Sequence, residues 1–542
     1  MSFPFKLTSR AREANASPSV YLEKGRYRIR NPAPKPEFRN VSQSSRIRSL
    51  STSNDRNSIF TAIIVILLAF ACLTCFGAAY YLFTTRWDSA SLASGSQPAN
   101  TSILQVLELD DARSKCPLVN PDTKFLAYLP HSGFHNQRIA LENALTLSHM
   151  LNRTLLVPPA RLGRKSLRYV NYDSLKTYVS LSGKEGLDHC SRLPSHINIP
   201  PECSDYFDYT HVSWEWLADL KVIKSQQKLI FRWNMTDGWV HDCLSINDSN
   251  TLTLRDTGRY HYRFLDTSTD ASPVSHKYQE DLHVSSLIHL HQPLLQIGTL
   301  FGTSRLRLQN SENIDVRRKV RESMSFANPV LLQVADAVHK ALGGFYLGVH
   351  VRIGDGQFLI HSNDNVRLVW WRMMHEVLGF TIEDTLRLEK SFSTRESPPT
   401  PPDTFMRQPI QPGEDFPLTT QSPKTPCRAV LHSLPHLVSL NIPLFISTDV
   451  KDPGQDPNLE IFLRTFPCTF FLADFTKEMS LLDHFRNDYD GLALKPFVSP
   501  FVDAMIAGKA WRVIGTPGST FSRFVEDLLW PTYHGVAIQQ RG

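Results

Sequence analysis

The sequence lacks the short motifs by which many metal and nucleotide sites are recognised. None of the six cysteines outside the apolar segment 59–83 has a neighbour at zinc-ligand spacing. No glycine-rich loop ends in Gly-Lys-Ser/Thr, no Asp-x-Asp pair stands at the end of a predicted strand, and no internal repeat is found. A P-loop and a repeat architecture are therefore excluded, and no metal is expected.

Net charge is also scarce outside the N-terminus. The chain has 542 residues and a formal charge of +6, but residues 1–57 hold twelve Lys and Arg against four Asp and Glu. That segment carries +8, which leaves about −2 for the rest. The chain as a whole has 42% hydrophobic and 20% charged residues, which is typical of folded proteins. Because the part after residue 57 is close to neutral, it should not bind nucleic acid.

Residues 59–83 contain no charged side chain at all. A helix of that length would be roughly 37 Å long, enough to cross a hydrocarbon core of about 30 Å. Arginines precede the segment, and between Arg86 and Arg113 there is no Lys or Arg. This asymmetry predicts a single-pass type II protein of the Golgi or endoplasmic reticulum membrane, with the residues from about 86 onward in the lumen. The predicted organisation is a disordered basic cytosolic tail (1–57), a transmembrane helix (58–85) and a stem (86–120).

Six cysteines follow the apolar segment, an even number that suggests up to three disulfides in an oxidising lumen. Their pairing is left open. Four Asn-x-Ser/Thr sequences are candidate glycosylation sites, and we expect the second to be hidden in a helix: Asn100, Asn152, Asn234 and Asn247.

Short apolar runs alternate with helical patterns, which predicts an α/β fold. Strands at 125–129 and 154–157 flank a helix at 137–151, a βαβ unit and hence a parallel sheet. The alternation returns with strands at 345–352, 444–448, 470–473 and 511–514 and helices at 502–509 and 520–529. We predict two Rossmann-like domains, 121–335 and 336–542, the second with a Pro-rich insertion at 393–426.

One predicted strand ends in His350 and Arg352, and Gly354 then permits a turn. In open α/β sheets ligands lie beyond the carboxyl ends of the strands, where an arginine offers a charged fork for a diphosphate. The alternative is that Arg352 pairs with Asp355 and only fastens a loop.

Three further segments carry polar groups at strand–helix junctions. Gly133 to Arg138 could present a helix N-terminus to an anion, or be an ordinary capped helix. Ser519 and Thr520 could hold phosphate oxygens, or merely cap a helix. Asp503, the one acid on an apolar helix, needs a partner, which could be a nucleotide or a structural cation.

In this order the segments resemble the GDP-fucose O-fucosyltransferases that modify proteins. The resemblance covers roughly 124–160 and 345–530 and leaves about 160–340 unmatched. The matching segments read YLPHSGFHNQRIALENALTLSHMLNRTLLVPP, GVHVRIGDG, LFISTD and FVDAMIAGKAWRVIGTPGSTFSRFV. The resemblance implies a GT-B fold, in which two Rossmann-like halves enclose the donor. It also implies transfer of fucose from GDP-fucose with inversion, without a metal or other cofactor.

The resemblance also assigns roles to single residues. Arg352 would contact the pyrophosphate and stabilise the departing GDP, and Asn136 would act with it at the reacting centre. The donor-binding residues would be Gly133, Phe134, Arg138, His350, Asp503, Ser519, Thr520 and Phe521.

The sequence departs from the family at Ser132, where one branch has a glutamate proposed as the base. His131, His135 and Glu142 are the nearby candidates for that role, unless a dissociative reaction needs little base assistance. The expected acceptor is a Ser or Thr hydroxyl of a secretory protein. The alternatives are an α1,6-type fucosyltransferase acting on glycans, an inactive relative or membrane-anchored binding protein, and another nucleotide-sugar transferase.

Overall fold

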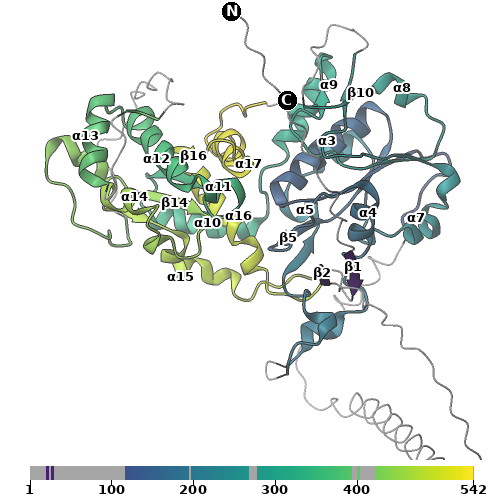
Figure 1. Ribbon diagram of the computed structural model, residues 1–542, viewed down its shortest axis with the longest axis horizontal. Coiled ribbons are helices and arrows are strands. Elements are labelled where there is room, and N and C mark those ends of the chain that lie inside the picture. Colours follow the sequence, from purple (N-terminus) through teal and green to yellow (C-terminus); the bar gives the residue numbers. More distant parts are fainter. Residues whose placement is uncertain are drawn as a thin grey trace, which may run out of the picture. The chain divides into compact units, whose positions relative to one another are not determined.

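The computed structural model describes residues 116–194, 197–267, 277–393, 400–402 and 423–540, and a short hairpin near the N-terminus (Figure 1). The chain divides into two compact units, 1–110 and 111–542. In the first, β1 (Val20–Glu23) pairs antiparallel with β2 (Arg26–Ile29), so part of the tail predicted to be disordered forms a hairpin.

The predicted membrane segment at 59–83 lies outside the described residues, as do most of the stem and of the Pro-rich insertion. Within the ranges that the structure describes, no helix has both the length and the apolar character needed to cross a bilayer.

A five-stranded parallel sheet, here the N-terminal sheet, lies in the first part of the second unit. Its strand order is β7-β4-β3-β11-β8. The strands are β3 (Phe125–Tyr128), β4 (Thr154–Val157), β7 (Leu229–Phe231), β8 (Thr251–Leu254) and β11 (Leu294–Ile297). The central β3 and its neighbour β4 are buried at every residue, which explains their unbroken apolar sequence.

Helix α3 (Phe134–Met150) connects β3 to β4 and begins three residues before the predicted start. Leu141, Ala144 and Leu145 are fully buried against the sheet. The helix ends before Asn152, which is exposed in a turn with φ of 49°. The expectation that Asn152 is hidden in a helix is therefore wrong, because the chain turns there to enter β4.

The segment between α3 and the second sheet, for which the sequence showed little pattern, contains two smaller sheets and several helices. Strands β5 (Ala160–Gly163) and β6 (Tyr209–Val212) pair antiparallel; β10 (Glu280–His283), β9 (Tyr262–Leu265) and β12 (Leu306–Arg307) are parallel. The helices are α4 (Tyr172–Ser180), α5 (Trp214–Leu217), α6 (Lys221–Gln226), α7 (Asp237–Leu244), α8 (Val284–Ile288), α9 (Ser311–Glu322) and α10 (Pro329–Ala341).

A four-stranded parallel sheet, the C-terminal sheet, has the order β15-β14-β13-β16. Its strands are β13 (Leu347–Val351), β14 (Leu444–Thr448), β15 (Thr469–Phe470) and β16 (Arg512–Gly515). The helices around it are α11 (Gly356–Ile360), α12 (Ser362–Arg372), α13 (Ile382–Phe392), α14 (Glu460–Thr465), α15 (Thr476–Met479), α16 (Lys495–Gly508), α17 (Thr520–Phe524) and α18 (Trp530–Tyr533). The predicted mixed α/β fold with parallel sheets is confirmed.

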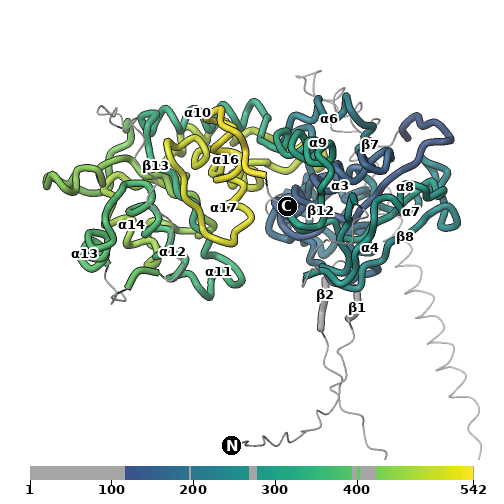
Figure 2. The backbone as a smooth tube through the Cα atoms, turned by 90° about the horizontal axis from the view of Figure 1, so that it is seen from above, coloured from purple at the N-terminus to yellow at the C-terminus, as the bar shows by residue number. Residues whose placement is uncertain are grey.

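Helix α16 packs directly on β13 and beside α10 (Figures 1 and 2). A Cβ atom at Gly348 would lie 2.7 Å from the Ala507 carbonyl oxygen, so only glycine allows this approach. Pro496 in the first turn suits the helix start, because its missing N–H has no partner to lose. This close packing fixes the helix that carries Asp503 against the strand that carries His350.

All six cysteines after residue 110 form disulfides, as the even count suggested. The pairs are Cys116–Cys243, Cys190–Cys203 and Cys427–Cys468. The last of these ties Cys427, which follows the Pro-rich insertion, to the residue before β15 at the edge of the C-terminal sheet.

Candidate active site

A cleft of about 700 Å³ opens where the strands of the C-terminal sheet end. His350 of β13 is in register with Ser447 of β14 and Gly515 of β16, so the carboxyl ends of three parallel strands meet at one edge. The volume falls in the range of small-molecule sites. Most of the predicted site residues line this cleft: Gly133, Phe134, His135, Asn136, His350, Arg352, Asp503, Thr520 and Phe521.

Arg352 both fastens a loop and faces the cleft. Its Nε and Nη2 donate to the Asp355 carboxylate at 3.1 and 3.0 Å, and its backbone N–H donates to the Thr516 hydroxyl at 3.0 Å. The Arg352 side chain is 28% exposed and that of Asp355 is 64% exposed. Because the partner carboxylate stands in water, the guanidinium fork can exchange it for a phosphate at little cost.

Asp449, which was not predicted as a site residue, shapes the loop after Arg352. Its carboxylate accepts hydrogen bonds from the backbone N–H groups of Ile353 and Gly354 at 2.9 and 3.0 Å. A Cβ atom on Gly354 would lie 2.9 Å from the Asp449 Cγ. The signal in the sequence was an acid placed directly after β14, at the edge where β13 also ends.

His350 is buried behind Arg352 and is held by two contacts. Its Nδ1 lies 2.7 Å from the Ser522 hydroxyl, and its ring stacks on Phe521 at 4.5 Å. Burial, with a smaller effect from Arg352, lowers the pKa of His350 to about 3. The imidazole is therefore neutral at physiological pH and acts as a dipole rather than a charge.

Asp503 faces the cleft from α16. Its carboxylate accepts a hydrogen bond from the Ser447 hydroxyl at 2.5 Å, and burial raises its pKa to about 7. The side-chain hydrogen-bond partner of Asp503 is thus a hydroxyl group and not a cation. The carboxyl group can donate or accept a hydrogen bond near neutral pH, which suits contact with a polar ligand.

Ser519 and Thr520 have different positions. Ser519 is fully buried, does not line the cleft, and accepts the Ser522 N–H at 3.2 Å as the N-cap of α17. The capping alternative is therefore correct for Ser519, and its assignment as a donor-binding residue is not supported by its position. Thr520, one residue later, lines the cleft.

The first turn of α3 forms the other side of the cleft, together with residues 161–164 and Ser166; we call these residues the α3 wall. Gly133 is the N-cap, has no side-chain cap, and faces open space, because an added Cβ would meet nothing within 4 Å. Asn136 has a buried Oδ1 without a hydrogen-bond partner. Phe134 packs against Phe501 of α16 at 4.5 Å and so joins the two sides.

Arg138 and Glu142 do not reach the cleft. Both are buried and form an ion pair with each other, and Arg321 lies 3.8 Å from the Glu142 carboxylate. Neither side chain lines the cleft, whereas Gly133, Phe134, His135 and Asn136 do. These positions do not favour the predicted roles of Arg138 in donor binding and of Glu142 as a base.

Of the two candidate histidines, only His135 is placed for chemistry. His131 is buried away from the cleft, with its ring nitrogens 2.7 Å from the Ser132 hydroxyl and 2.6 Å from the Thr299 hydroxyl. Both ring nitrogens of His131 therefore have partners within the protein, and its position does not favour the predicted role as a base. His135 lines the cleft, touches the edge of Phe521 at 4.2 Å, and has two buried ring nitrogens without partners.

Burial lowers the pKa of His135 well below its usual value, and the positive charges of Arg138 and Arg352 lower it further. A neutral ring with a free nitrogen can accept a hydrogen bond from a hydroxyl group in the cleft.

Three further cations line the cleft that the sequence interpretation missed: Arg161, Arg164 and Lys451. Arg161 follows Pro158-Pro159 at the end of β4, and Lys451 follows the end of β14. Position after a strand end was the available signal for Arg161 and Lys451, but this signal alone did not distinguish them from surface residues.

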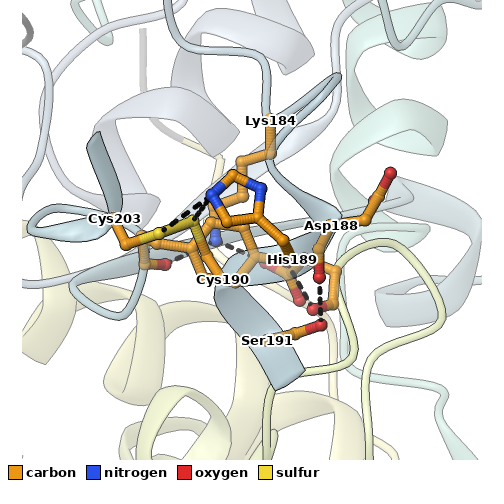
Figure 3. The surroundings of a disulfide bond; sticks show 8 residues. Lys184, Asp188, His189, Cys190, Ser191 and Cys203 are labelled. Atoms are coloured by element: carbon orange, nitrogen blue, oxygen red, sulfur yellow. Dashed lines mark hydrogen bonds and ion pairs between the residues drawn. A yellow bond between two sulfur atoms is a disulfide. The ribbon is translucent and has the colours of Figure 1, made fainter. Parts of the chain in front are cut away.

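Among the described residues, one group of possible metal ligands lies close together, formed by His189, Cys190 and Cys203. Figure 3 shows the two cysteines joined in a disulfide, with the His189 Nε2 3.6 Å from each sulfur. The paired sulfurs have no thiolate to offer a metal.

Comparison with known proteins bears on what this cleft binds. The sequence model of the GDP-fucose protein O-fucosyltransferase family matches residues 125–528. O-fucosyltransferase 30 of Arabidopsis thaliana is 58% identical over 36 residues, which is 7% of this chain and 7% of the relative. The crystal structure of POFUT1 with GDP-fucose aligns with 78% of this chain and 96% of its own, at 11% identity and a TM-score of 0.33. POFUT1 with GDP aligns with 77% and 97%, at 12% identity and the same TM-score.

Proposed function

Because the chain belongs to the GDP-fucose protein O-fucosyltransferase family, we propose that it transfers L-fucose from GDP-fucose to a Ser or Thr hydroxyl of a secretory-pathway protein. The observation that carries the proposal is Arg352 at the end of β13, partly exposed in a cleft that lies within the residues matched by the family. The two parallel sheets are consistent with a GT-B arrangement of two Rossmann-like halves.

In the proposed reaction the acceptor oxygen attacks the anomeric carbon of fucose from the face opposite the phosphate. The carbon–oxygen bond to the β-phosphate breaks, its electron pair stays on the phosphate, and the configuration inverts. The departing GDP gains one negative charge, which Arg352 stabilises more strongly than it stabilises the intact donor. A fixed guanidinium thus supplies the electrostatic role that a metal has in other transferases.

His135 is the proposed acceptor of the hydroxyl proton, since it is the one base candidate that lines the cleft. Its lowered pKa makes it a weak base in the empty cleft. A bound diphosphate would raise that pKa by adding negative charge nearby, so the base would gain strength when the donor is present.

The anchoring and compartment are part of the proposal. The apolar segment 59–83 and the arginines before it support a type II membrane protein of the Golgi or endoplasmic reticulum, with residues after 86 in the lumen. Three disulfides agree with an oxidising compartment.

A donor screen with the purified full-length chain tests the function. We expect GDP-fucose to be cleaved to GDP in preference to UDP-sugars, slowly with water and faster with an acceptor. Preference for a UDP-sugar would contradict the proposal. GDP release accelerated by a glycan but by no protein would favour the α1,6-type alternative, and binding without turnover would indicate an inactive relative.

A further inference from the structure

Arg161 lines the cleft, but the proposed reaction assigns it no role. It lies in β5 and is tied to α3 through the Gln137 side chain. The Arg161 N–H donates to Gln137 Oε1 at 2.9 Å, and Gln137 Nε2 donates to the Arg161 carbonyl at 2.9 Å and to the Ser132 carbonyl at 3.0 Å. The backbone of Arg161 is thereby fixed against the turn that leads into Gly133.

The guanidinium of Arg161 is held in place but is not neutralised. It stacks on the Tyr209 ring at 3.4 Å, and its Nε donates to the Lys165 carbonyl at 2.9 Å. Its Nη1 is buried without a hydrogen-bond partner. The carboxylate whose charge acts on it, Asp205, is paired with Lys165, and none of the described carboxylates forms an ion pair with Arg161 itself. Arg352 and Arg138, by contrast, each have a carboxylate partner. Partial burial of a cation that has no ion-pair partner is costly, so a ligand that supplies an anion would bind favourably.

The distribution of charged side chains along the cleft favours the binding of an anion beside Arg161. The α3 wall contains Arg161 and Arg164 and no acid, while the three lining carboxylates all lie on the C-terminal sheet side: Asp355, Asp449 and Asp503. Each of those three already accepts a hydrogen bond from the protein. The start of α3, with no side-chain cap and no acid in its first turn, adds positive potential on the same wall.

We infer that Arg161 is a second catalytic cation, which binds the donor diphosphate from the α3 wall while Arg352 binds it from β13. The inference rests on the proposed function. Arg352 and Asp355 together carry no net charge, whereas the donor diphosphate brings two negative charges. A third negative charge forms when the carbon–oxygen bond of the donor breaks and its electron pair moves to the β-phosphate. Arg161 supplies the unpaired positive charge that this step needs.

The test compares binding of GDP and of guanosine to the full-length chain by calorimetry. Arg161→Met removes the charge and keeps the aliphatic stem, Arg161→Lys keeps a charge without the fork, and Arg168→Met, which changes an exposed cation that does not line the cleft, is the control. We expect Arg161→Met to weaken GDP binding at least tenfold and guanosine binding less than twofold. Arg161→Lys should be intermediate, and Arg168→Met should stay within threefold of the parent.

The rate of hydrolysis of GDP-fucose to GDP and free fucose is a second measurement, and it needs no acceptor. Arg161→Met should lower kcat at least tenfold, because the extra negative charge is absent from the bound donor and develops as its carbon–oxygen bond breaks. Unchanged GDP affinity in Arg161→Met, or equal losses for GDP and guanosine, would overturn the inference and leave the proposed function intact. Failure of the parent chain to bind GDP would overturn both.

Discussion

Arg352 lies at the end of β13 and pairs with a carboxylate that is itself 64% exposed. Such a pair contributes about 0–1 kcal/mol to stability, since both groups remain well hydrated when they separate. The residue can therefore be removed with little effect on the fold. Arg352 should contribute more to the free energy of ligand binding than to that of folding, because a diphosphate in the cleft would be partly shielded from water.

Arg352→Ala is accordingly expected to reduce turnover of GDP-fucose at least a thousandfold, while the melting temperature changes by no more than about 2 °C. Turnover is measured as GDP release and stability by calorimetry on the same preparation. Glu460→Ala, which removes an exposed ion pair with Arg464, is a control for the loss of a surface pair. Extensive unfolding of Arg352→Ala would show that its role is structural.

Asp503 should make the stability of the folded protein depend on pH. Burial raises its pKa from 3.8 to about 7, so the folded protein keeps a proton that the unfolded chain loses between these values. Stability therefore falls as pH rises through that window, by up to about 1.4 kcal/mol per pH unit. Below the unfolded pKa of 3.8 the carboxyl group is protonated in both states, so this loss of stability is absent there.

Asp503→Asn removes the titration and keeps most of the shape. Measured by urea denaturation, its unfolding free energy relative to the parent should increase by roughly 3 kcal/mol from pH 4 to pH 7.5. Asp242→Asn, which alters a carboxylate that is 74% exposed, should show no such trend. A difference that stays constant with pH would mean that Asp503 titrates normally in the folded state.

Some site residues could be predicted from the sequence and others could not. His350 and Arg352 end a strand of apolar residues, so their place at the sheet edge follows from the pattern alone. Arg138 was assigned to the site by the family resemblance and Glu142 by its nearness to Ser132, and neither argument shows whether a side chain points into the cleft or into the core. Arg161 was missed because its environment comes from Tyr209, 48 positions later, and from Gln137, 24 positions earlier.

At the scale of elements, the segment before α16 joins the two sheets. Asp490 is fully buried among residues of the preceding half: it accepts hydrogen bonds from the Lys184 ammonium at 2.5 Å and the Thr210 hydroxyl at 2.7 Å. Tyr489 stacks on Trp233 at 5.1 Å. Lys184 lies near the Cys190–Cys203 disulfide, as Figure 3 shows. The start of α16, and with it one wall of the cleft, is thus fixed by a buried ion pair.

Lys184→Met should destabilise the protein by about 3–5 kcal/mol, because it leaves the Asp490 carboxylate buried without its cation. Lys184→Met combined with Asp490→Asn should recover part of that loss, since no uncompensated charge remains. Lys165→Met removes an ion pair whose lysine is 50% exposed and should cost at most about 1 kcal/mol. Urea denaturation separates these cases; equal small losses for Lys184→Met and Lys165→Met would contradict the account.

The predicted elements are accurate where a run of apolar residues has clear ends. The strand predicted at 444–448 coincides with β14, and that at 154–157 coincides with β4. Strands β7, β8 and β11 were not predicted, although they complete the N-terminal sheet. Each has only three or four residues, and β11 pairs with a strand nearly 170 positions earlier, so long-range contacts rather than local pattern define them.

For the whole molecule, one hydrophobic core connects the two sheets. It runs from Leu126 and Leu145 beside β3, through α10, to Val502 and Leu528 near the C-terminus. The mixed α/β character followed from the alternation of strands and helices. The way in which the halves join did not, because the aromatic contacts between α3 and α16, such as Phe134 with Phe501, connect residues more than 360 positions apart.

The central claim for the whole molecule is that this cleft binds a guanine nucleotide diphosphate through arginine. Titration of GDP into the full-length chain in buffer containing EDTA, followed by calorimetry, tests it most directly. The account predicts binding at micromolar concentration without Mg²⁺, weakened at least tenfold by Arg352→Ala. No heat of binding for the folded parent chain, or equal affinity in the variant, would contradict it.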